Sequence, residues 1–262
     1  MPDSFFTTDS EWFIPTTHTR GPWNVDHCHA GPPTGLIARA LELALPGHRL
    51  TRLTVNLTKP IPFAGFRIDA TITREGRIVA LAEARLIDRQ DTVCATASSL
   101  HMAPQPKHPM PTHPTTKLNP DDAQIGDFPI EHITHGQPNF TGDGVSVKYP
   151  PNQNAKPGQT IAWLRTVPLL ADEAPSAFQK ICPLADCGNA FGRNAEITEF
   201  NFMNPDLTVL LHRDPVGEWL GTNAVSHWQS NGIGMADAEL FDAEGCVGRA
   251  LQTLLVRPAS AS

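Results

Sequence analysis

Two stretches of the sequence can be laid on each other without a gap: ARLIDRQDTVCATAS, residues 84–98, and AELFDAEGCVGRALQ, residues 238–252. Each stretch predicts a strand, a tight polar turn and a second strand. The gap-free match places Ser98 opposite Gln252. Because such a repeat indicates a duplicated unit, we expect an interface, and with it a candidate site, between the two copies.

The same order of helix and strands is predicted ahead of both hairpins. In the first copy, an apolar run from Thr34 to Leu45 has helical spacing. In the second copy, a helix is predicted to start at Ala174 and to be interrupted by Pro183. Strand-like alternation is found at residues 11–17, 50–60, 66–73, 145–148, 160–167, 200–213, 218–227, 234–241 and 247–256. Each copy is therefore predicted to contain a strand, a helix and then four antiparallel strands.

Proline indicates where the two copies join. The 262 residues include 25 prolines, many of them between Pro104 and Pro157, where neither a helix interior nor a central strand would tolerate them. We therefore predict a first domain at residues 1–103, a Pro-rich connection at 104–138 and a second domain at 139–262. A chain of this length can form two ordinary domains.

The bulk composition excludes several classes of protein. A formal net charge of −7 provides no basic field for nucleic acid. No stretch approaches the roughly 20 apolar residues of a membrane span, and the start of the chain lacks an export signal, so we expect a cytoplasmic protein. Five cysteines without a Cys-x-x-Cys pair are predicted to be reduced thiols. Adjacent residues such as His27-Cys28-His29 rarely converge on one ion, so neither a metal nor a cofactor is expected.

The predicted architecture, a long helix wrapped by a curved antiparallel sheet, resembles the hotdog fold. Two tandem copies in one chain are similar to the double-hotdog acyl-CoA thioesterases of the type II (TesB-like) family. The segments that match in kind are residues 31–41, Ala185-Asp186, His212-Arg213, and Leu251-Gln252 through Arg257. The resemblance implies an α+β double hotdog that acts on acyl-CoA.

In that family an Asp, a Gln and a Thr hold the attacking water. By resemblance, Asp186 takes the place of the Asp and Gln252 that of the Gln, whereas Asn204 stands where the family has Thr. Thr208 is the alternative for the family's Thr if the alignment of this segment to the family is shifted. The resemblance implies that Asp186 is the general base, and burial beside apolar walls is expected to raise the pKa of its carboxyl. The residues alone leave other roles open: a helix or turn cap for Asp186, a turn for Asn204, and an outward strand face for Gln252.

The negative charge that develops on a thioester carbonyl oxygen needs hydrogen-bond donors. The start of the first helix offers unpaired N–H groups and a positive dipole end. Pro32 and Pro33 have no N–H, so Thr34 and Gly35 are the candidate donors. His29, in the loop ahead of this helix, is a candidate polar contact at the entrance for the acyl or pantetheine part of the substrate.

We therefore expect a thioesterase that hydrolyses a fatty-acyl-type thioester by direct attack of water. Two alternatives stay open. A hotdog hydratase or dehydratase for an enoyl- or hydroxyacyl thioester would need an Asp and a His that converge, and the His29 loop is the candidate supplier. A non-catalytic acyl-thioester binder is favoured by Asn204 in place of Thr. Open sheet edges also favour a homo-oligomer.

Overall fold

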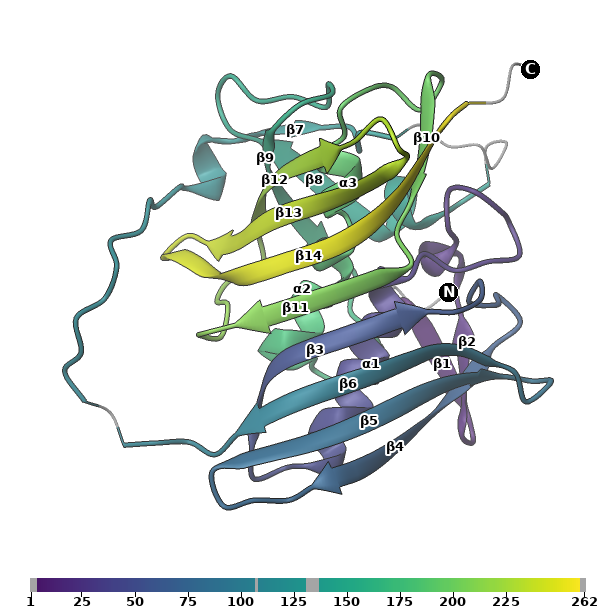
Figure 1. Ribbon diagram of the computed structural model, residues 1–262, viewed down its shortest axis with the longest axis vertical. Helices are drawn as coiled ribbons and strands as arrows, with labels where there is room; N and C mark the ends of the chain where they lie inside the picture. The colour runs from purple at the N-terminus through teal and green to yellow at the C-terminus, as the bar shows by residue number, and fades with distance from the viewer. Residues whose placement is uncertain (1–3, 107, 131–136, 260–262) are drawn as a thin grey trace.

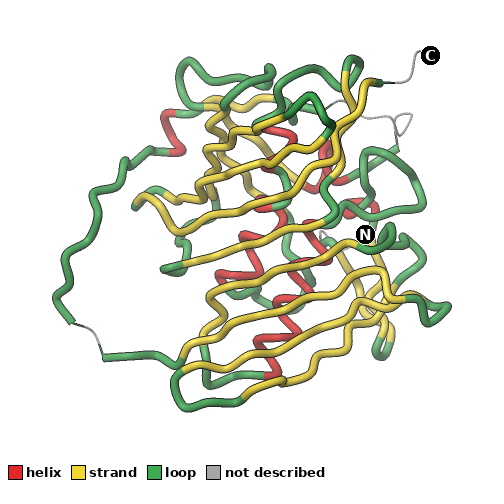
Figure 2. The backbone as a smooth tube through the Cα atoms, viewed as in Figure 1, coloured by secondary structure: helices red, strands yellow, loops and turns green. Residues whose placement is uncertain are grey.

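The computed structural model describes residues 4–106, 108–130 and 137–259. Fourteen strands in these residues form one continuous antiparallel sheet, and the helices lie on one of its faces (Figures 1 and 2). The strands are β1 Phe6–Asp9, β2 Trp12–Pro15, β3 Arg49–Leu57, β4 Phe66–Arg74, β5 Val79–Asp88, β6 Val93–Met102, β7 Gln124–Gly126, β8 Val145–Tyr149, β9 Thr160–Thr166, β10 Phe200–Met203, β11 Asp206–Leu211, β12 Leu220–Trp228, β13 Ile233–Asp242 and β14 Gly245–Pro258. The helices are α1 Gly31–Ala44, α2 Ala177–Ala185 and α3 Gly188–Phe191, with short turns η1 Thr17–Thr19, η2 Pro120–Asp122 and η3 Phe140–Gly144.

The two halves of the chain meet where β3 pairs with β11 in the middle of the sheet. The strand order is β1-β2-β4-β5-β6-β3-β11-β14-β13-β12-β9-β8-β7, with β10 on the edge of β14. At the centre of this seam Thr54 is paired with Thr208, and their hydroxyls are 3.0 Å apart. These threonines are 154 positions apart, as are Ala84 and Ala238 in the repeated hairpins. The seam therefore joins equivalent positions of the repeat.

Helix α1 packs against the sheet and against α2, which also contacts the sheet. Its first turn contains Pro32 and Pro33, which suit a helix start because the N–H groups there have no intrahelical acceptor. Leu36, Ile37 and Leu41 are fully buried. The two helices approach so closely that a Cβ on Gly35 would lie 3.2 Å from the carbonyl oxygen of Gln179.

The repeated hairpins differ by one residue at the turn, and this corrects the equivalence inferred from the sequence. Five residues separate the paired Ile87 and Val93, but only four separate the paired Phe241 and Cys246. The returning strands are therefore offset by one position from the gap-free match. Ser99, which is buried, is the counterpart of Gln252, and the exposed Ser98 is not.

Three expected segments are also refined. The opening strand is a hairpin, β1 and β2. The strand expected at residues 200–213 is broken at Asn204-Pro205 into β10 and β11. The connection expected at 104–138 follows an extended path after β6 (Figure 1), but its later part forms η2 and β7, which pairs with β8. Residues 131–136 lie outside the described residues. None of the helices in the described part of the chain has the length and apolar composition needed to cross a membrane.

The seam can be tested by a double-mutant cycle. Thr54→Val and Thr208→Val each remove one hydroxyl of the shared hydrogen bond. Because such bonds contribute about 0.5–1.5 kcal/mol, we expect the two substitutions to be coupled by about this amount in urea unfolding. Thr51→Val is the control, since its hydroxyl bonds to Leu100 within the first half and should not couple to Thr208→Val. Additive effects for the Thr54 and Thr208 variants would contradict the seam hydrogen bond.

Candidate functional site

A cavity of about 600 Å³ lies where the loop before α1 faces the second half of the chain. Its polar lining includes His29, Asp186, Asn189 and Asn204. Apolar side chains form much of the remaining wall, among them Trp23, Leu57, Ile61, Phe128, Ile130 and Phe202. Concave, largely apolar sites with a few convergent polar groups are typical ligand sites.

Asp186 lines this cavity, directly after α2, and is 5 % exposed. Its Oδ1 accepts a hydrogen bond from Asn204 Nδ2 at 3.0 Å and another from Gln252 Nε2 at 3.2 Å. Asn204 reaches it because the strand breaks before Pro205, which has no N–H. Gln252 faces inward from β14 and is 2 % exposed. The three residues that the sequence analysis singled out are thus in direct contact.

The second carboxylate oxygen of Asp186 faces the first half of the chain. His29 Nδ1 is 3.2 Å from Oδ2 and accepts a hydrogen bond from the Gly31 N–H at 3.2 Å. The same N–H also favours the ionised form of the Asp186 carboxyl. The imidazole stacks on Phe140 with ring centroids 4.0 Å apart, which fixes its orientation. His29 was expected at the substrate entrance, but in the structure it also contacts the carboxylate directly.

Asn189 completes the polar network, although the sequence analysis did not identify it. Its N–H donates to Gln252 Oε1 at 3.0 Å, and its Nδ2 donates to Asn204 Oδ1 at 3.0 Å. Gln252 Nε2 also donates to the main-chain oxygen of Asp186 at 3.1 Å, and Asn204 Nδ2 to that of Asp206 at 3.2 Å. The signal available in the sequence was spacing, because Asn189 follows Asp186 by three positions in a helical region.

Burial controls the ionisation of the two titratable groups that meet here. Desolvation raises the pKa of Asp186 to about 7, although the hydrogen bonds from Asn204, Gly31 and Gln252 act in the opposite direction. Burial lowers the pKa of His29 to about 3. A carboxyl with a pKa near neutrality can exchange a proton under physiological conditions.

Thr34 and Gly35 do not reach the cavity, which corrects their expected role as oxyanion donors. The N–H of Thr34 donates to the carbonyl oxygen of Ala30 at 3.0 Å. Gly35 lies in the second turn of α1 and faces Leu169 and Gln179. Ala30 lines the cavity, and its N–H has no partner among the described residues. It is a donor that the sequence analysis missed.

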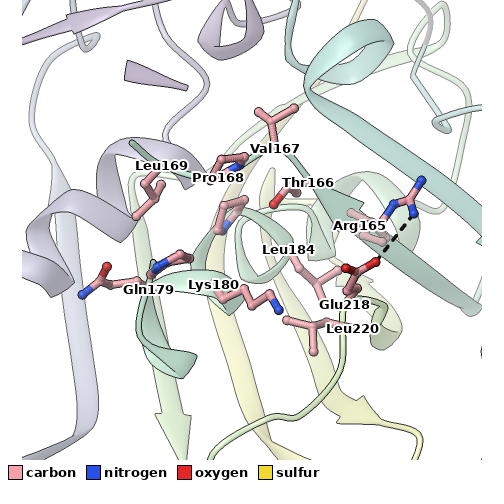
Figure 3. Close-up of a pocket in the computed structure, with 13 residues that line it drawn as sticks. Arg165, Thr166, Val167, Pro168, Leu169, Gln179, Lys180, Leu184, Glu218 and Leu220 are labelled. Carbon is pink, nitrogen blue, oxygen red and sulfur yellow. Dashed lines mark ion pairs between the residues drawn. The ribbon is translucent and has the colours of Figure 1, made fainter. Parts of the chain in front are cut away.

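Two other cavities lie away from these residues. One, of about 370 Å³ beside β9 and α2, contains the Arg165–Glu218 ion pair at 3.7 Å (Figure 3). The other, of about 410 Å³, contains Glu42 near the end of α1. Glu42 accepts hydrogen bonds from Ser176 Oγ at 2.8 Å and Gln179 Nε2 at 2.6 Å, at the start of α2. Each helix therefore ends with a carboxylate that faces the start of the other helix.

Helices packed on one face of a large curved antiparallel sheet are the arrangement of a hotdog-fold protein. Two family models match this chain: the acyl-CoA thioesterase N-terminal domain over residues 19–102 and the C-terminal domain over residues 104–256. The chain belongs to the acyl-CoA thioesterase family and is a thioester hydrolase.

Solved structures confirm the fold at low sequence identity. A protein from Novosphingobium aromaticivorans, provisionally described as a thioesterase, is 15% identical with a TM-score of 0.71, over 95% of this chain and 97% of that chain. A hotdog-fold protein of unknown function from Alicyclobacillus acidocaldarius is 16% identical with a TM-score of 0.69 (98% and 96%). The acyl-CoA thioesterase II TesB2 from Mycobacterium marinum is 14% identical with a TM-score of 0.64 (97% and 96%). Among curated protein sequences, no significant match is found.

Because Asp186 is buried, we predict that Asp186→Asn raises the free energy of unfolding, by an amount that depends on pH. Its pKa is about 7 when folded and about 3.9 when unfolded, so folding takes up a proton between these values. As pH rises from 4 to 7, ionisation of Asp186 should therefore lower the free energy of unfolding of the wild type by roughly 4 kcal/mol. Above pH 7 this group should cause little further change. Asp186→Asn carries no charge and should avoid this loss. Urea unfolding at pH 4, 6 and 8 measures the difference.

The matched control is Asp9→Asn, which changes an exposed carboxylate. Its difference from the wild type should stay small and nearly constant across the three pH values. A pH-independent difference for Asp186→Asn would contradict the burial of its ionised form.

Proposed function

We propose that this protein is a tandem double hotdog that hydrolyses a fatty-acyl-type thioester of CoA by direct attack of water. The proposed domains are residues 1–103 and 139–262, joined by the connection at 104–138. The seam between equivalent strands and the separate matches of the two family domains support the duplication. The observation that carries the function is a carboxylate, Asp186, buried in an apolar-walled cavity to which both halves contribute.

In the proposed mechanism Asp186 is the base that takes the proton of the attacking water. Asn204 and Gln252 keep its carboxylate in one orientation. Each of their amide oxygens accepts one hydrogen bond from Asn189, which leaves a second lone pair on each oxygen. Asn204 lines the cavity, so the second lone pair of its Oδ1 can orient the water. The free N–H of Ala30, in place of Thr34 and Gly35, would stabilise the oxyanion.

The apolar side chains around the cavity would hold the acyl chain, because burial of methylene groups is favourable. Lys59 also lines the cavity and would meet the anionic CoA portion at its mouth. A homo-oligomer remains a prediction. Both ends of the strand order, β1 and β7, are short edge strands, and the edges of sheets are common places for association.

A hydratase acting on an enoyl thioester is the second candidate, because His29 and Asp186 do converge in the structure. Such an enzyme would add water across a double bond and leave the thioester intact. Analysis of the products formed from an enoyl-CoA separates the two: free CoA thiol indicates hydrolysis, whereas a hydroxyacyl-CoA indicates hydration.

Thiol release from acyl-CoAs of graded chain length tests the proposed function. We expect turnover by the wild type, with kcat/KM rising about tenfold per pH unit up to the pKa near 7 and levelling above it, because Asp186 must be ionised. Asp186→Asn should lower kcat at least 100-fold.

Glu42→Gln is the control, since it removes a carboxylate in a similar position at the end of the other helix, outside this cavity. It should keep most of the activity. Full activity of folded Asp186→Asn would remove Asp186 from the mechanism, and tight binding without thiol release would indicate a binding protein.

A further inference from the structure

The cavity beside the Asp186 carboxylate has two chemically different ends. At one end Ile130, Ala190 and Phe202 line the cavity, and all three belong to one cluster of buried apolar side chains. The other end is lined by the segment that contains Lys59. Among the described residues around the cavity, Lys59 is the only one with a permanent positive charge. The cavity therefore offers an apolar end to a hydrocarbon and a basic end to an anion.

The order of residues after β10 places Asp186 between these two ends. Asn204, which donates to Asp186, directly follows this strand. Phe202 of the apolar end precedes Asn204 by two positions, and residues two apart along a strand share a face and lie about 7 Å from each other. On the other side of Asn204 is Pro205, whose carbonyl oxygen accepts the Leu57 N–H of the basic end at 2.7 Å.

The apolar end also begins close to the carboxylate on the helical side. Asp186 and Cys187 both have helical backbone angles and lead directly into α3. Ala190 follows Asp186 by four positions, so their Cβ atoms are about 5–6 Å apart on one face. A hydrocarbon chain bound at Asp186 can thus enter the apolar end without crossing a polar surface.

Phe202 closes this end of the cavity. The residue is 5 % exposed, and its ring packs on that of Trp228 with centroids 5.7 Å apart. Trp23, from the loop before α1, approaches the same ring edge-on at 6.5 Å. Buried Leu254 and Val256 belong to the same cluster, so packed side chains and not a channel support the ring.

We propose that Phe202 determines the longest acyl group that this protein accepts, because the acyl chain extends from Asp186 into the apolar end and stops at this ring. This inference rests on the proposed thioester hydrolysis and gives it a direction, with the acyl group toward α3 and β10 and CoA toward Lys59. Burial of methylene groups favours this direction. The opposite direction would place the phosphates of CoA against apolar side chains, where they would lose water without gaining a partner.

Straight-chain acyl-CoAs of increasing length test the limit in the thiol-release assay. For the wild type we expect kcat/KM to rise by up to about fourfold per added methylene until the chain reaches the ring, and to fall beyond it because the packed core does not make room. In Phe202→Ala the maximum should move to acyl groups about two to four carbons longer, since a phenyl ring is roughly as wide as three carbon–carbon bonds. A variant that is only less stable would lose activity at all lengths alike, without moving the maximum.

Phe200→Ala is the matched control. Phe200 lies on the same strand and packs on the same Trp228 at 6.1 Å, but it is not among the described residues that line the cavity. It should keep the wild-type maximum. Leu57→Ala enlarges the basic end of the cavity and should also leave the maximum in place. A maximum that stays in place in folded Phe202→Ala, or that moves in Leu57→Ala instead, would overturn the proposal.

Phe202→Leu covers the case in which the alanine variant does not fold, because it keeps a branched apolar side chain in the cluster. Its maximum should move in the same direction by about one carbon. If the wild type releases no thiol from any acyl-CoA, the proposed hydrolysis fails, and calorimetric titration with the same acyl-CoAs tests the apolar end by itself. Kd should then fall with each methylene up to a limiting length, and Phe202→Leu should increase that length. An unchanged limiting length would rule out the role of Phe202.

Discussion

The antiparallel pairing of β3 with β11 is the contact on which both the sheet and the site depend. It places the end of α2 beside the start of α1, and so brings His29 from the first half to within 3.2 Å of Asp186 in the second. The helices are so close at position 35 that a Cβ there would lie 3.2 Å from the carbonyl oxygen of Gln179, so a larger residue would require α2 to shift. Neither half by itself contains both the carboxylate and the imidazole.

The carboxylate at this junction is kept in place at a cost to stability. A buried charge is tolerated only when hydrogen bonds surround it, and here the side chains of Asn204 and Gln252 and the Gly31 N–H provide them. Asn189 in turn fixes both amide side chains, so the network has few alternative arrangements. Buried ionisable groups with shifted pKa values are common where chemistry takes place.

Much of the fold could be predicted from the sequence, because periodicity reports burial directly. The α1 region and the paired hairpins follow from patterns that the structure confirms. The strand pattern alone left open which face Gln252 takes, and the structure buries it. The register of the returning strand could not be predicted, since a turn that is one residue shorter leaves no mark in a gap-free match. The roles given to Thr34 and Gly35 failed for a related reason: whether an N–H is free depends on where a helix begins, and α1 begins at Gly31. Asn189 and Ala30 are too ordinary in sequence to stand out.

The carboxylate of Glu42 illustrates what the proposed duplication within one chain would allow. In an assembly of identical subunits every substitution occurs twice, so two crevices related by symmetry must evolve together. On a single chain that constraint is absent. The carboxylate of Glu42 accepts hydrogen bonds from Ser176 and Gln179, and these bonds link the two helices. The carboxylate of Asp186 instead lines the cavity. One of the two carboxylate sites can thus serve to hold the helices together, while the other can become an active site.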